Sequence, residues 1–126
     1  MSPVNESQPD VVVLEQRIEP VVLRRLVERF EDMVKYVVDV ERGVIAIGGE
    51  MHSDAEQVLL ESGSRQADLW GANYYPGRGR EGCIEFTSFI NIRPSAGNRG
   101  MELQDGALRA RVHEITSALV GEGEPL

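Results

Sequence analysis

The sequence predicts an α+β fold in which a mostly antiparallel sheet of about five strands carries three helices packed on one face. Short β-branched segments alternate with segments whose apolar residues recur at helical spacing. The connections between them are short, which favours antiparallel neighbours. After the first strand and helix, the strands come in two pairs, each followed by a helix, so the expected order is β-α-β-β-α-β-β-α.

The first half of the chain supplies a strand, a helix and a hairpin. Residues 11–17 begin with three valines, which are typical of a strand. Pro20 suits the first turn of a helix, and apolar residues follow it at helical spacing up to Phe30. Residues 34–40 and 44–47 are apolar and β-branched, and the short turn between them predicts a hairpin.

The second half is expected to add a helix, two strands and a last helix. Ser53 and Glu56 match a capping box, in which each side chain pairs with the other residue's backbone N–H, and this predicts a short helix. Residues 69–75 and 83–93 have the composition of strands, and the second is expected to be long. Asp105 is a suitable cap for a final helix with its own apolar stripe.

Alternation along these strands gives one apolar face and one face of mixed polarity. A half-solvated antiparallel sheet produces this pattern without any function. A ligand surface or a subunit interface is the alternative, and Val37, Tyr75 and Phe89 on the mixed face would suit an interface.

Length and charge limit the classes of protein. A chain of 126 residues has room for one core, which we place at residues 11–120, with disordered tails at 1–10 and 121–126. The formal net charge of −8 disfavours nucleic acid as a partner. No apolar run approaches the roughly 20 residues of a membrane span, and no signal peptide is evident. Cys83 is the only cysteine, so we expect a cytoplasmic protein and a packed thiol.

The first unusual stretch, Gly48–Asp54, joins a strand to a helix. Gly48 and Gly49 allow backbone conformations closed to other residues, and a helix N-terminus can attract an anion. The stretch lacks both phosphate-loop signatures and carries two carboxylates, which weakens a nucleotide hypothesis.

The same stretch offers a candidate metal site. Glu50, His52 and Asp54 alternate, so in an extended segment their side chains would point the same way. One histidine and two carboxylates can bind a divalent metal, or the histidine can transfer a proton. Asp68, Asn73 and Glu85 are possible remote contributors.

The second unusual stretch is Asn91–Arg99. Arg93 and Arg99 can each make bidentate contacts with a carboxylate or a phosphate, and Asn91 and Asn98 can add hydrogen bonds. The alternative is that the arginines pair with carboxylates of this acidic chain itself. These four residues, with Gly48 and Gly49, form the predicted ligand site.

Three stretches carry a resemblance to a known family: Met33–Glu56, Gln66–Asn73 and Asn91–Arg99. Across about residues 11–119 the chain resembles small bacterial proteins catalogued only as a domain of unknown function. The resemblance implies a bacterial origin and an intracellular location, and it implies no chemistry.

These observations leave three hypotheses of function open. The first is a non-enzymatic domain that binds a small anion or a protein partner and forms a homo-oligomer. The second is a small metal-dependent hydrolase that uses Glu50, His52 and Asp54. The third is a toxin–antitoxin or regulatory component. The sequence implies no cofactor.

Overall fold

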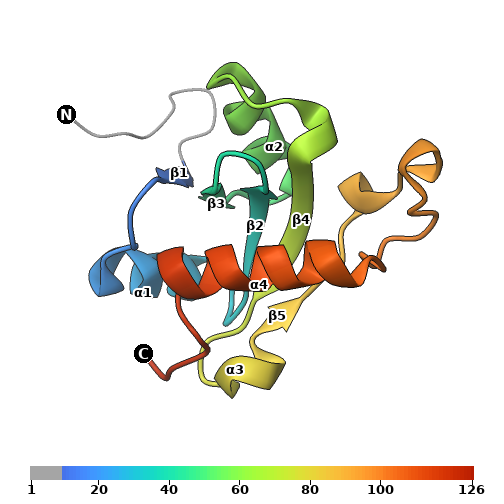
Figure 1. Ribbon diagram of the computed structural model, residues 1–126. Coiled ribbons are helices and arrows are strands. Elements are labelled where there is room, and N and C mark those ends of the chain that lie inside the picture. The colour runs from blue at the N-terminus through green and yellow to red at the C-terminus, as the bar shows by residue number, and fades with distance from the viewer. Residues whose placement is uncertain (1–9) are drawn as a thin grey trace.

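A computed structural model describes residues 10–126, so the predicted N-terminal tail lies, apart from Asp10, outside the described residues. The chain forms one antiparallel sheet of five strands in the order β1-β3-β2-β4-β5 (Figure 1). The strands are β1 (Val11–Leu14), β2 (Val34–Asp39), β3 (Val44–Gly48), β4 (Leu69–Tyr74) and β5 (Ile84–Glu85). The predicted α+β class and the β2–β3 hairpin are therefore confirmed.

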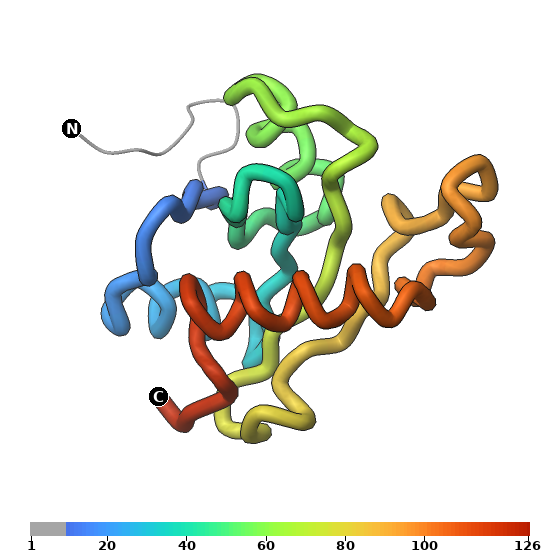
Figure 2. Tube along the Cα trace, in the orientation of Figure 1, coloured from blue at the N-terminus to red at the C-terminus, as the bar shows by residue number. Residues whose placement is uncertain are grey.

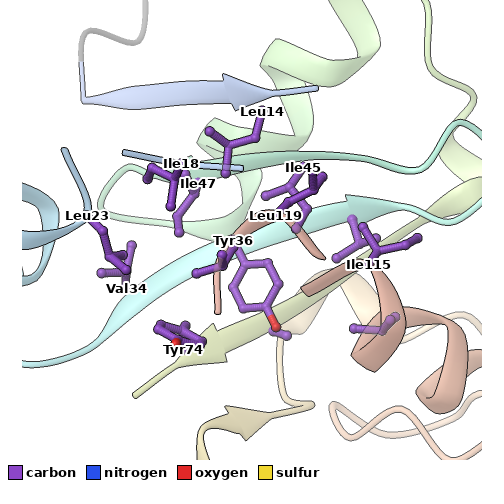
Figure 3. Packing of buried hydrophobic residues seen from close by; sticks show 14 of the residues in the cluster. Leu14, Ile18, Leu23, Val34, Tyr36, Ile45, Ile47, Tyr74, Ile115 and Leu119 are labelled. Carbon is purple, nitrogen blue, oxygen red and sulfur yellow. The ribbon is translucent and has the colours of Figure 1, made fainter. Parts of the chain in front are cut away.

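The helices cover both faces of the sheet. Helices α1 (Pro20–Arg29) and α4 (Gly106–Leu119) pack on one face, where their apolar residues join a single core with Tyr36, Ile47 and Tyr74 (Figure 3). Helix α2 (His52–Glu61) packs on the opposite face, and in Figure 1 it lies beyond the strands while α4 crosses in front of them. The prediction that all three helices share one face is wrong.

The mixed face is buried because α2 covers part of it. Val37, which the alternation places on this face, has no exposed surface and joins a second core with Ala55, Val58 and Leu59 of α2. A sheet covered on both faces needs apolar residues on both, which explains why β2 and β3 are almost entirely buried. The expectation of a half-solvated sheet is therefore wrong for its central strands.

The predicted long strand at residues 83–93 is also wrong. Only Ile84–Glu85 pairs with β4, after a short helix α3 (Gly79–Gly82). Beyond β5 the chain forms two 3-10 turns, η2 (Phe89–Asn91) and η3 (Pro94–Ala96). A third such turn, η1 (Gln66–Asp68), precedes β4.

The predicted N-cap of α4 is found in the structure, whereas the predicted N-cap of α2 is not. Asp105 caps α4 as predicted, because its carboxylate accepts the Leu108 N–H at 2.9 Å. Helix α2 begins at His52, ahead of the predicted Ser53 cap, and the Asp54 carboxylate accepts the Met51 N–H at 3.0 Å. Asp54 therefore takes the role that we assigned to Glu56.

Residues 121–126, predicted to be a loose tail, are packed against the domain. The Gly123 N–H donates to the Tyr74 hydroxyl at 2.9 Å, and the Gly77 N–H donates to the Gly123 carbonyl at 3.0 Å. Figure 2 shows this end of the trace beside the turn that precedes α3. Within residues 10–126, no helix has the length and apolar character needed to span a membrane.

Candidate ligand pocket

A pocket of about 310 Å³ opens where the start of α2 meets β4 and the segment that follows β5. Its apolar wall consists of Met51, Phe89, Ile90 and Met101, and its polar lining consists of Lys35, His52, Ser53, Asn73, Thr87 and Ser88. Phe89 is 75% exposed and Met51 is 59% exposed, so large apolar side chains surround the mouth. The pocket therefore combines an apolar entrance with a polar floor.

The sheet register builds the polar floor. Lys35 of β2 pairs with Asn73 of β4, and Asn73 pairs with Glu85 of β5. Paired residues project on the same face, so the three side chains form a row across three strands on the face that α2 covers. The Asn73 side-chain amide donates to the Glu85 carboxylate at 2.7 Å, and the Tyr75 hydroxyl donates to the same oxygen at 3.2 Å.

Asn73 is the most unusual member of this row. The residue is 6% exposed, and its buried Oδ1 forms no hydrogen bond of good geometry among the described residues, although the His52 ring lies near enough to interact with it. Because Nδ2 points to Glu85, Oδ1 points away from β5 on the other branch of the same amide. A buried acceptor without a partner costs about 1–3 kcal/mol, so a bound donor would remove that cost.

Lys35 supplies positive charge at the same place. Its Nζ donates to the Glu50 carbonyl at 2.6 Å, which leaves two further N–H donors. No carboxylate in residues 10–126 forms an ion pair with it, although the chain carries 21 acidic residues. Lys35 is thus a cation whose charge is not neutralised by direct contact.

His52, in the first turn of α2, forms the wall above the floor. Its Nε2 lies 2.9 Å from the Ala72 carbonyl, which can only accept, so Nε2 carries the proton and the neutral ring keeps a lone pair on Nδ1. Burial lowers the pKa of His52, and the positive charge of Lys35 acts in the same direction. The Ala72 hydrogen bond, Asn73 and Glu85 oppose that shift, and the ring is neutral at pH 7.

The two predicted site glycines have structural roles. Gly48 has φ of +106°, and a Cβ there would lie 2.0 Å from the Asp10 carbonyl oxygen, so glycine is needed for β1 to approach. Gly49 has φ of +88° and packs against Val11 and Asp54. Neither glycine lines the pocket.

Asn91 and Asn98, the two predicted amide ligands, are buried and hydrogen-bonded within the protein. Asn91 accepts the Gly71 N–H at 2.8 Å and donates to the Gly71 and Met101 carbonyls at 3.0 and 3.1 Å. Asn98 donates to the carbonyls of Asn91, Gly100 and Glu102, with distances of 2.8 to 3.1 Å. These contacts hold the segment after β5 in place.

The two predicted arginines differ. Arg93 stacks on Trp70 with its Cζ 4.3 Å from the ring centroid, and it donates to the carbonyls of Leu69 and Ile90. Burial lowers the pKa of Arg93, against the effect of nearby Glu56. Arg99 is exposed and does not line the pocket.

The structure separates the three predicted metal ligands. His52 lines the pocket, Asp54 caps α2, and Glu50 contacts Lys35 through its backbone carbonyl. Among residues 10–126, no group of three His, Cys, Asp or Glu side chains is placed to hold a metal ion. Two of the remote contributors, Asn73 and Glu85, do lie in the row beneath His52, whereas Asp68 lies at the far end of β4.

Lys35 was missed by the sequence analysis, because nothing in the sequence specifies that it pairs with Asn73. The two residues lie far apart in the chain, and only the register of β2 against β4 brings them together. The available signal was that Lys35 is the only lysine of the chain and interrupts an apolar strand.

The fold and site together define a small α+β domain with a covered antiparallel sheet and one amphipathic pocket at the start of α2. Comparison with family models then places the chain: residues 12–119 match the family described as a protein of unknown function (DUF5674), and the chain belongs to it. Comparison with curated proteins and with solved structures gave no match.

Proposed function

We propose that this domain binds a small amphipathic anion in the pocket and does not catalyse its conversion. The observation that carries the proposal is the position of Lys35. A cation without a carboxylate partner lies at the floor of a pocket whose mouth is apolar. Ligand sites commonly join an apolar wall to a few polar groups that fix orientation.

The charge balance of the protein strengthens this assignment to an anion. The described ion pairs use arginines, each on an exposed surface, and leave Lys35 to the pocket. His52 is neutral at pH 7, so it adds no second positive charge and the site suits a ligand with one negative charge. The apolar wall of Met51, Phe89 and Met101 would contact the rest of the molecule.

A nuclear magnetic resonance titration with 4-methylpentanoate and 3-phenylpropanoate tests the proposal. Saturable shifts are expected at the backbone amides of His52, Asn73 and Phe89, which surround the pocket. Lys35→Met should weaken binding roughly tenfold, since a hydrogen bond to a charged group contributes about 1.5–3 kcal/mol.

Arg25→Met is the matched control, because Arg25 is exposed on α1 and its loss changes the net charge equally. Arg99→Gln separates the pocket from the predicted site at Asn91–Arg99. Linear, non-saturating shifts would refute the proposal. Binding that is insensitive to Lys35→Met but lost in Arg99→Gln would also refute it and would place the anion at the second stretch.

A further inference from the structure

The proposed pocket contains a hydrogen-bond acceptor that an anion alone cannot use. Asn73 Oδ1 is buried in the floor and forms no hydrogen bond of good geometry among the described residues, and Asn73 is the register partner of Lys35. Directly paired residues on adjacent strands have Cβ atoms about 5 Å apart. Lys35 and Asn73 also line the same pocket, so a ligand whose carboxylate meets Lys35 can place its neighbouring carbon against the Asn73 amide.

The charge next to Asn73 specifies which donor is preferred. Glu85 lies on the other side of Asn73 and is hydrogen-bonded to its Nδ2 at 2.7 Å. No arginine, lysine or histidine among residues 10–126 forms an ion pair with Glu85. Glu85 is exposed and lies outside the pocket lining, so its negative charge acts on the floor through the Asn73 amide. A positively charged N–H donor is favoured there over a neutral one.

Resting on the anion-binding function proposed above, we infer that the ligand is an apolar 2-amino acid. Its carboxylate faces Lys35, its ammonium group donates to Asn73 Oδ1 under the field of Glu85, and its side chain contacts Phe89 and Met101. Lys35 on β2 is positive, and the Asn73 oxygen on β4 and Glu85 on β5 are negative, so the row is complementary to a zwitterion. The pocket volume of about 310 Å³ admits a molecule of this size.

Three compounds with the same carbon skeleton test the inference: 4-methylpentanoate, 2-hydroxy-4-methylpentanoate and leucine. They differ only in the group on the carbon next to the carboxylate, which is hydrogen, hydroxyl or ammonium. Their dissociation constants are measured by the same resonance titration at pH 7. We expect leucine to bind roughly tenfold more tightly than 4-methylpentanoate, with the hydroxy acid between them.

Two variants identify the residues responsible. Asn73→Leu should abolish the preference for leucine, so the ratio of the dissociation constants of 4-methylpentanoate and leucine should fall to about one. Glu85→Gln keeps an acceptor for the Asn73 amide and should lower the ratio of the dissociation constants of 4-methylpentanoate and leucine several-fold. Glu81→Gln is the matched control, because Glu81 is exposed on α3 and removes the same charge.

The outcomes separate this inference from the function on which it rests. Binding of no member of the series would refute the anion-binding function itself. Equal affinity for all three compounds, or tighter binding of 4-methylpentanoate, would refute only the amino-acid inference. If Asn73→Leu does not fold, the wild-type series and Glu85→Gln still decide between these results.

Discussion

Replacement of Asn91 by alanine should destabilise the protein more than its position after β5 would suggest. Asn91 has no exposed surface, and its amide makes three hydrogen bonds, two to Gly71 of β4 and one to Met101. Alanine leaves the Gly71 N–H and carbonyl without partners in a buried position, whereas the Met101 carbonyl keeps its bond from the Ser88 N–H. At about 1 kcal/mol for each bond, the free energy of unfolding should fall by about 3 kcal/mol.

Urea denaturation followed by Trp70 fluorescence measures this change, since Trp70 is the only tryptophan and is 4% exposed when folded. With a slope of about 2 kcal/mol per molar urea, the midpoint should fall by about 1.5 M. Gln57→Ala, on the exposed side of α2, is the control and should change stability by less than about 0.5 kcal/mol.

Amide hydrogen exchange at Gly71 supplies a second measurement. If the segment after β5 detaches while the rest stays folded, the global midpoint shifts less, but the Gly71 N–H loses its partner and exchanges faster. A fall in stability below about 1 kcal/mol together with unchanged protection of Gly71 would show that the Asn91 contacts do not hold this segment.

Three further predictions concern the core, the pocket histidine and the start of the sheet. Tyr36→Phe removes a buried hydroxyl 2.8 Å from Thr116 Oγ1 and should cost about 1 kcal/mol in the same urea assay; no change would argue against that bond. Because burial lowers the folded pKa of His52 below 6.5, its contribution to stability is complete above about pH 6.5 and is lost as pH falls through the folded pKa. Urea midpoints between pH 7 and 5 should therefore decline less in His52→Gln than in the wild type, and parallel profiles would contradict this. Gly48→Ala should cost more than about 2 kcal/mol because of the contact with the Asp10 carbonyl, whereas Gly77→Ala, also at positive φ but with open space around it, should cost about 1 kcal/mol; equal losses would mean that backbone conformation alone matters.

Local signals in the sequence predicted most of the elements, the strand at residues 83–93 excepted, and contacts between distant segments decided their arrangement. Pro20 marks a helix start through its fixed backbone angle and Asp105 through its side-chain carboxylate, and both helices form as expected. The placement of α2 depends instead on what Val37 and Ala46 meet on the far face of the sheet. A lysine in a strand suggests that its face of the sheet is solvated. Lys35 does line the pocket, but Val37 on the same face is buried beneath α2.

The candidate site shows the same division. His52, Asn73 and Glu85 were identified as residues able to carry chemistry, but their grouping depends on strand register, which a single sequence specifies only weakly. The polar residues of Asn91–Arg99 suggested a ligand site because arginine and asparagine side chains can bind an anion. Asn91, Arg93 and Asn98 instead bond within the protein, since burying such groups is costly unless they are paired. Most of those pairing groups are backbone atoms of β4 and of the same segment, which sequence patterns do not reveal.

The short β5 explains why the pocket exists. A strand continuing from Glu85 would pair with the rest of β4, but Asn91 and Arg93 bond to that edge with their side chains, at Gly71 and Leu69 respectively. Their alternate spacing matches the alternate residues of β4, so side chains replace the missing ladder. The backbone is thereby released from the sheet and can place Ser88 and Phe89 opposite His52, which encloses the floor around Asn73. Asn91 and Arg93 thus contribute to the pocket indirectly, because their side chains form hydrogen bonds with backbone groups at the edge of β4 that a neighbouring strand would otherwise bind.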